Sequence, residues 1–156
     1  MSDFSAEDIA RALVPAAQGV DEPRRSRLRF THLDFERTPG ARCSAAVELE
    51  WVAGEGAVGR ADGVASPLGD LRVVAEASLR AIELFLGGSL SMELIGVKTM
   101  RAFDANIVMV SVLAHTAEGP RRLLGCNLSE DDPLRGAVIA TLQATNRVLG
   151  NAIATR

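Results

Sequence analysis

The chain is poor in residues that mark several functional classes. It has no tyrosine, one tryptophan and two cysteines, and Lys98 is its only lysine. Scarce aromatic side chains argue against the stacking platforms that bind single-stranded nucleic acid. A net charge of −3 gives no attraction to nucleic acid or to an anionic membrane surface. Cys43 and Cys126 are too few for a disulfide framework. We therefore expect neither nucleic acid nor a membrane as a partner.

Long apolar runs are also missing. No stretch is long and apolar enough to span a bilayer, and the N-terminus has no charged start followed by an apolar core. We therefore expect a cytoplasmic protein. The 156 residues are 47% hydrophobic, which predicts one globular domain with a substantial core.

What the chain does contain is an internal repeat. The segment 73–87 recurs in outline at 136–150. Five residues are identical at a spacing of 63: Ala77 and Ala140, Leu79 and Leu142, Ala81 and Ala144, Leu86 and Leu149, and Gly87 and Gly150. A repeat of this length that ends in a helix is one supersecondary unit used twice.

The repeat predicts the domain organisation and the fold class. Residues 1–26 are expected to form a short N-terminal helix and a polar linker, because residues 5–8 resemble a capping box. Residues 27–156 are expected to form a single domain of two repeats, about 27–88 and 89–151. Each repeat has the pattern β-β-β-α. The predicted fold is α+β, with two three-stranded antiparallel sheets and one helix packed on each.

Local signals place several elements. Apolar and polar residues alternate over 45–51, which predicts a half-buried strand, and the parity shift at Thr31-His32 predicts a bulge in the strand before it. The two helices are predicted at about 71–86 and 133–149. Asp132 suits the N-cap of the second helix, and Gly87 and Gly150 are placed to end the helices in a left-handed conformation.

The second strands of the two repeats differ. Glu48 and Glu50 give the first a polar face, whereas Ile107–Leu113 is apolar on both faces. Something must cover the second face of that strand: the sheet of the other repeat or a second subunit. We expect a homodimer, and burial of the strand within one subunit is the alternative.

Catalytic signals are weak. His32 and His115 belong to no metal-binding pattern, the cysteines form no CxxC pair, and no nucleophile elbow, P-loop or dinucleotide fingerprint is present. We predict no catalytic residue, no metal, no cofactor and no enzymatic activity. A small enzyme that uses Cys126 or His115 with carboxylates brought together by folding stays open as an alternative.

Two loops carry the binding signal, 62–70 and 125–132, and each joins a strand to a helix N-terminus. Free backbone amides at such a position favour an anionic group, for example the carboxylate of an amino acid or a small organic acid. In a duplicated unit, a pseudo-two-fold axis can bring the loops together around a small-molecule pocket. The alternative is that they are only connectors.

The second repeat resembles a known family. The run 103–112, an Asp-Ala turn followed by alternating valines, is similar to the C-terminal regulatory, dimerising domain of 2-isopropylmalate synthase and citramalate synthase. The run 125–129, the acidic helix start at Asp132, and the small residues before Asn146 are similar as well. The resemblance covers about residues 27–151. It implies a duplicated β-β-β-α module that binds a feedback inhibitor near its dimer interface. The family's catalytic barrel has no counterpart here, so condensing activity is not implied.

The leading hypothesis is a free-standing, non-catalytic module that dimerises and binds a small metabolite, an amino acid or a small organic acid, in a regulatory role. The predicted contacts are polar in Ser66, Asp70, Ser129 and Asp132, and apolar in Leu68 and Leu128. The alternative is a protein–protein interaction or assembly module with no small-molecule ligand.

Overall fold

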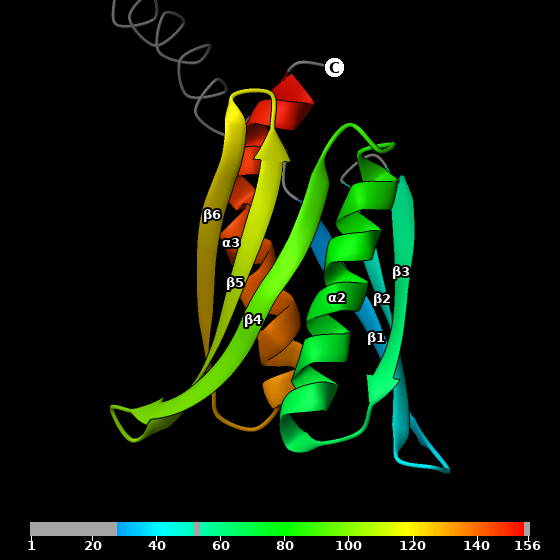
Figure 1. Cartoon of the computed structure of the whole chain (residues 1–156), viewed down its shortest axis with the longest axis vertical. Helices are drawn as coiled ribbons and strands as arrows, with labels where there is room; N and C mark the ends of the chain where they lie inside the picture. The colour runs from blue at the N-terminus through cyan, green and yellow to red at the C-terminus, as the bar shows by residue number, and fades with distance from the viewer. Residues whose placement is uncertain (1–27, 52–53, 155–156) are drawn as a thin grey trace, which may run out of the picture.

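The computed structural model describes residues 28–51 and 54–154 (Figure 1). In chain order, its elements are β1 (Arg29–Thr38), β2 (Arg42–Glu50), β3 (Gly56–Val64), α2 (Pro67–Phe85), β4 (Ser91–Ala102), β5 (Ala105–Thr116), β6 (Gly119–Ser129) and α3 (Pro133–Ala154). The N-terminal helix that the sequence predicts lies outside the described residues.

The predicted fold class is confirmed. Strands β1-β2-β3 form one antiparallel sheet, sheet A, and β4-β5-β6 form a second, sheet B. Each sheet is followed in the chain by one helix. The bulge predicted near Thr31 is present, because the register of β1 against β2 shifts between Phe30 and His32. The equivalent pair in sheet B shifts between Leu94 and Gly96.

The two helices lie between the two sheets (Figure 1). Helix α2 packs on β2 and β3 of its own sheet and also contacts β4 and α3. Helix α3 packs on β5 and β6 and touches β1. Because helices occupy the space between the sheets, neither sheet covers the other. The sequence left two ways to cover the second face of the apolar strand Ile107–Leu113, the sheet of the other repeat or a second subunit. The first of these is therefore ruled out.

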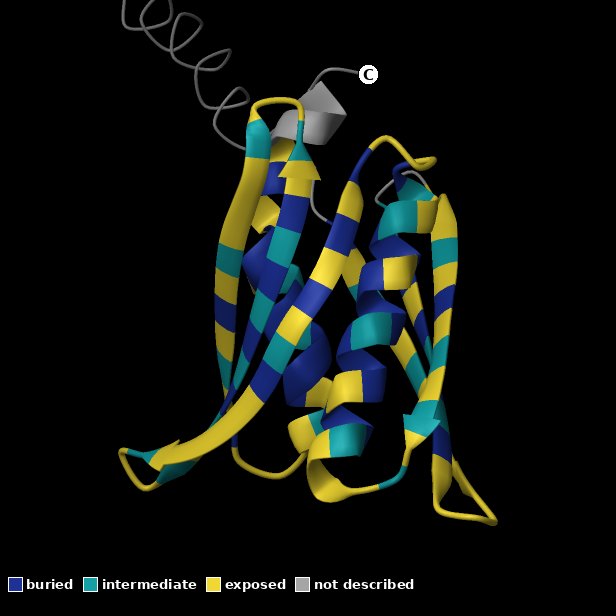
Figure 2. Ribbon diagram, in the orientation of Figure 1, coloured by how far each residue is buried: buried dark blue, intermediate teal, exposed yellow. Residues whose placement is uncertain are grey.

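The core follows the alternation of the central strands. The residues of β2 that face the helices are buried, namely Cys43, Ala45, Val47 and Leu49. Their counterparts on β5 are Val108, Val110, Val112 and Ala114. Buried positions alternate with half-buried or exposed ones along both strands (Figure 2). The inner faces of both sheets and the facing sides of both helices thus form one continuous core.

Glycine lets each helix approach its third strand closely. A side chain added at Gly59 would collide with the backbone of Ala77 and Ala81 in α2. A side chain added at Gly125 would collide with the backbone of Ala140 and Ala144 in α3. The alanines shared by the two repeats therefore mark the helix turns that rest against a glycine of the sheet.

The same contacts show that the repeats are not related by one constant offset. The helix positions Ala77 and Ala140 are 63 residues apart, but Gly59 and Gly125 are 66 apart. The facing core residues Val47 and Val110, which pair with these glycines, are again 63 apart. The β5–β6 hairpin of the second repeat is therefore longer than the β2–β3 hairpin of the first. The first repeat compensates with about one more helical turn between its third strand and the alanines that contact the glycine.

The helix ends differ from the sequence prediction at two places. Helix α2 begins at Pro67 rather than near Leu71, because Ser66 is extended and caps the helix, with proline in the first turn. Gly87 has a φ of 64° just after α2, as predicted. The predicted end of the second helix at Gly150 is wrong: α3 continues to Ala154. The local glycine signal is overridden because helix-compatible residues follow Gly150 and no proline stops the chain.

In the described residues, no helix has the length and apolar character needed to span a membrane.

Candidate functional site

The two helix-entry loops meet at one end of the molecule. Both helices begin at the lower end of the view in Figure 1. A pocket of about 470 Å³ lies there, between the first turns of α2 and α3 and the strands β4 and β5. Pockets of this size hold small organic ligands.

The pocket wall is mainly apolar, with polar groups at intervals. The apolar residues are Pro67, Leu68, Leu71, Val108, Pro133 and Leu134. The polar residues are Asp70, Thr99, Asn106, Ser129 and Glu130. Such a wall can bury a hydrocarbon group while a few hydrogen-bonding groups orient the rest of a ligand.

The six predicted binding residues divide into three groups. Leu68, Asp70 and Ser129 line the pocket. Ser66 and Asp132 instead cap the helices: Ser66 Oγ accepts the Gly69 N–H at 2.8 Å, and Asp132 Oδ1 accepts the Arg135 N–H at 3.1 Å.

Leu128 lies on the face of sheet B that is opposite to the pocket. It pairs with Ile107, whereas the pocket residue Val108 belongs to the inner face. Leu128 is therefore on the outer face of sheet B, where it is 52% exposed.

Helix capping leaves a pair of backbone donors beside the pocket. Each helix starts with a proline, which has no N–H, and the third amide of each first turn is bound by its cap. Within the described residues, Leu68 and Leu134 are then the first-turn positions whose N–H groups have neither a capping nor an intrahelical partner. Both residues line the pocket, at the positive ends of two helix dipoles.

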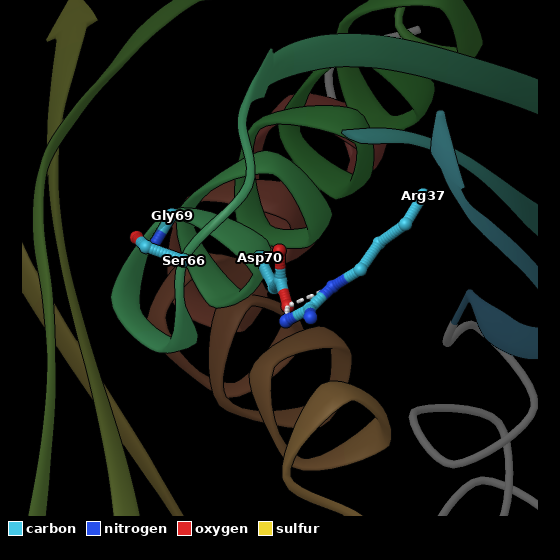
Figure 3. A network of polar contacts seen from close by, with 4 residues as sticks. All are labelled: Arg37, Ser66, Gly69 and Asp70. Carbon is cyan, nitrogen blue, oxygen red and sulfur yellow. Dashed lines mark hydrogen bonds and ion pairs between the residues drawn. The ribbon is translucent and has the colours of Figure 1, made fainter. Parts of the chain in front are cut away.

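Asp70 is the buried charge of the site. It lies in the first turn of α2, and only 9% of its side chain is exposed. Arg37 at the end of β1 reaches it, and its Nε donates to Asp70 Oδ2 at 3.1 Å while its Nη2 donates to the same oxygen (Figure 3). The hydrogen bond and the charge of Asp70 raise the pKa of Arg37. This ion pair ties sheet A to the entry of α2.

The other carboxylate oxygen of Asp70 is an unused acceptor. Asp70 Oδ1 is buried and has no hydrogen-bond partner among the residues that the structure describes. Buried polar atoms are nearly always paired, so an orphan acceptor beside a pocket calls for a donor. The terminal torsion of an aspartate is soft, so the carboxylate can turn about its Cβ–Cγ bond.

Arg37, Thr99 and Asn106 are among the residues that sequence reasoning missed. Arg37 continues the inward parity of Leu33 and Phe35 on β1, so an arginine at a core-facing position was the available signal. Thr99 and Asn106 lie close to the turn of the β4–β5 hairpin, and no local pattern connects them with the helix starts.

The described residues contain no group of three His, Cys, Asp or Glu side chains arranged to hold a metal ion. His32 pairs with Glu48 on the outer face of sheet A, and His115 lies near the end of β5 in sheet B. The two histidines therefore belong to different sheets. Cys43 is buried and Cys126 is exposed on the outer face of sheet B.

Two further hollows are less suited to a ligand. One of about 390 Å³ lies on the outer face of sheet A, and its charged residues are Asp34, Glu36, Arg60 and Asp62. The other, about 540 Å³, is near the end of α2 and includes Arg80 and Glu83. Neither combines apolar walls with a buried, unpartnered polar atom.

Comparison with known proteins adds no relative. No protein-family model matches the chain, and no curated protein matches its sequence. The resemblance to the regulatory domain of 2-isopropylmalate synthase therefore stays a prediction.

Proposed function

We propose that the protein is a non-catalytic regulatory module that binds a small metabolite between the first turns of α2 and α3. The observation that carries the proposal is the pocket itself, where two helix starts far apart in the sequence form one wall around a buried carboxylate with a free oxygen. The fold would hold the ligand and pass its effect to the sheets through the Arg37–Asp70 pair.

The charges around the pocket favour an amino acid over a simple organic acid. The N–H groups of Leu68 and Leu134 suit a carboxylate. Asp70 Oδ1 and the Glu130 carboxylate suit an ammonium group. A ligand with only a carboxylate would leave Asp70 Oδ1 without a donor. The apolar walls formed by Leu71 and Val108 suit an aliphatic side chain.

A thermal-shift series tests the ligand class. Each apolar amino acid is compared with its 2-hydroxy acid and its 2-oxo acid at millimolar concentration. We expect the amino acid to stabilise most and the 2-oxo acid least, because the latter offers Asp70 no donor. A ligand at 100 times its Kd adds about 2.7 kcal/mol to the free energy of unfolding. The absence of any shift across the series would contradict the proposal.

Two leucines of α2 provide a matched pair of variants. Leu68 lines the pocket and is 54% exposed, whereas Leu84 near the other end of the helix is 63% exposed. Leu68→Ala should lose most of the ligand-induced shift, and Leu84→Ala should keep it. Both variants should be about as stable as the parent without ligand, since surface substitutions usually change stability by less than about 0.5 kcal/mol.

A second function is favoured by a different observation. The outer face of sheet B is apolar and uncovered in the described chain, which supports an interaction or assembly module without a ligand. Assembly that persists while no compound shifts the melting temperature would favour this function over metabolite binding.

A further inference from the structure

The outer face of sheet B presents four rows of residues across its three strands. On β5 the residues are Ile107, Met109, Ser111 and Leu113, all half-buried. Their β4 neighbours are Met100, Lys98, Gly96 and Glu93. Their β6 neighbours are Leu128, Cys126, Leu124 and Arg122. Cross-strand neighbours share a face of the sheet. The face is thus apolar at one end and through its centre, with charged residues at its margins.

Sheet A supplies an internal comparison. Its equivalent outer face contains Asp34, Glu36, Glu48 and Asp62, so it is well solvated in the free chain. On sheet B, Leu124 is 63% exposed, Leu128 52% and Met100 45%. Apolar residues clustered on one sheet face, rimmed by charges, have the anatomy of a protein interface.

We propose that a second copy of this chain covers the outer face of sheet B, so that the protein is a face-to-face dimer. Four rows about 6.8 Å apart on three strands about 4.8 Å apart cover roughly 400 Å² in projection. Because side chains project from the sheet, the accessible area of this face is larger than its projection. It approaches the smallest area that specific dimers bury, on the order of 600 Å² per partner.

The charges on the face identify a second copy as the fitting partner. Glu93 is the one acidic residue of the four rows, and Lys98 and Arg122 are the basic ones. None of the three forms an ion pair within the described part of the chain. A two-fold axis along β5 lays β4 over the partner's β6, which brings Glu93 opposite Arg122. A two-fold axis across the strands at Ser111 exchanges the rows of Met109 and Leu113, which brings Glu93 opposite Lys98. Each of these two arrangements therefore places Glu93 opposite a basic residue of the partner copy.

Sedimentation of the full chain between about 1 and 200 µM tests the dimer, a range that covers micromolar dissociation constants. The matched variants are Leu124→Glu on sheet B and Val64→Glu on sheet A, because both residues are 63% exposed. We expect the parent and Val64→Glu to dimerise. Leu124→Glu should raise the dimer Kd about a hundred-fold or more, since it places two carboxylates in the contact. Far-UV circular dichroism checks that both variants fold.

Charge reversal then identifies the axis. Glu93→Arg should weaken the dimer. Adding Arg122→Glu restores it if the axis runs along β5, and adding Lys98→Glu restores it if the axis runs across the strands. A parent chain that stays monomeric at about 200 µM, or a Leu124→Glu variant that dimerises like Val64→Glu, would overturn the proposal. Ligand binding is a separate matter, because the pocket is on the inner side: a monomeric Leu124→Glu variant should still respond to the ligand.

Discussion

At the scale of single residues, Asp70 takes part in an ion pair and also lines the pocket. Its Oδ2 accepts two hydrogen bonds from Arg37, 33 residues earlier in the chain, while its Oδ1 has no described partner. The sequence drew attention to Asp70 because it begins a helix. Its partner could not be predicted from the sequence, because nothing within a few residues of Arg37 indicates which helix it contacts.

The Arg37–Asp70 pair should be asymmetric under mutation. Arg37→Met leaves a buried carboxylate without its cation, whereas Asp70→Asn leaves an arginine whose side chain is 58% exposed and can turn to water. We expect Arg37→Met to destabilise the protein more than Asp70→Asn. In urea unfolding, the double variant should be more stable than Arg37→Met alone. Equal losses in the two single variants would contradict this.

Cys43 should be an unreactive thiol in the folded protein. Cys43 is 1% exposed, and burial, followed by the nearby Asp70 carboxylate, raises the pKa of its thiol above the ordinary 9.0. In Cys126→Ser, where Cys43 is the one remaining thiol, a disulfide reagent at pH 8 should react slowly until denaturant is added. Fast reaction in the native state would show that β2 opens locally.

The raised pKa of Cys43 also makes the stability of the protein depend on pH. Folding favours the protonated thiol, so its contribution is fully present below pH 9.0 and is lost as the pH rises through the folded pKa. Between pH 8 and 10, the urea midpoint of Cys126→Ser should fall more steeply than that of Cys43→Ala/Cys126→Ser.

At the scale of elements, the glycine contacts explain why the repeat keeps alanine at matching helix positions. Gly59 rests on α2 and Gly125 on α3, in each case against helix backbone. Backbone cannot move aside as a flexible side chain can. The sequence showed the shared alanines, but their partners in the strands became apparent only from the packed structure.

Substituting either glycine should therefore push a helix away from its sheet. We expect Gly59→Ala and Gly125→Ala each to cost about 1–3 kcal/mol of unfolding free energy, the usual range for overpacking. Gly96→Ala is the control, since nothing lies within 4 Å of its added Cβ. Chemical denaturation of all three at low protein concentration checks the difference, and equal stabilities would contradict the close contact.

At the end of α3, the sign of the stability change on Gly150→Ala distinguishes a helix that continues past Gly150 from one that ends there. Gly150 is inside the helix, is exposed, and does not have the positive φ of a left-handed cap. Gly150→Ala should therefore stabilise the protein by roughly 0.5–1 kcal/mol. If the helix ended at Gly150 in the left-handed conformation that the sequence suggests, the same substitution would destabilise it. A thermal melt distinguishes the two.

At the scale of the whole molecule, the repeats share their core rather than forming two independent units. Helix α2 has ten buried residues among its 19, more than the single stripe of a surface helix. It achieves this because it packs on sheet A and also against α3 and β4, which belong to the second repeat.

Separated halves should consequently fail to fold alone. Fragments 28–88 and 89–156 should each lack a cooperative thermal transition, because each exposes a helix face that the other normally buries. An equimolar mixture should regain helical circular dichroism and a cooperative transition. A sharp melt of either fragment by itself would mean that one repeat is a self-sufficient domain.

The sequence by itself determined the elements and their order. Period-two alternation, capping residues, prolines and turn glycines are local signals, and together with the repeat they predicted two β-β-β-α units and loops at the helix starts. Tertiary structure alone decided that the helices lie between the sheets, that both entry loops share one pocket, that Arg37 meets Asp70 and that Leu128 faces away. The reason is physical. Local patterns specify which face of an element is apolar, but which faces meet depends on how all the elements can be buried together.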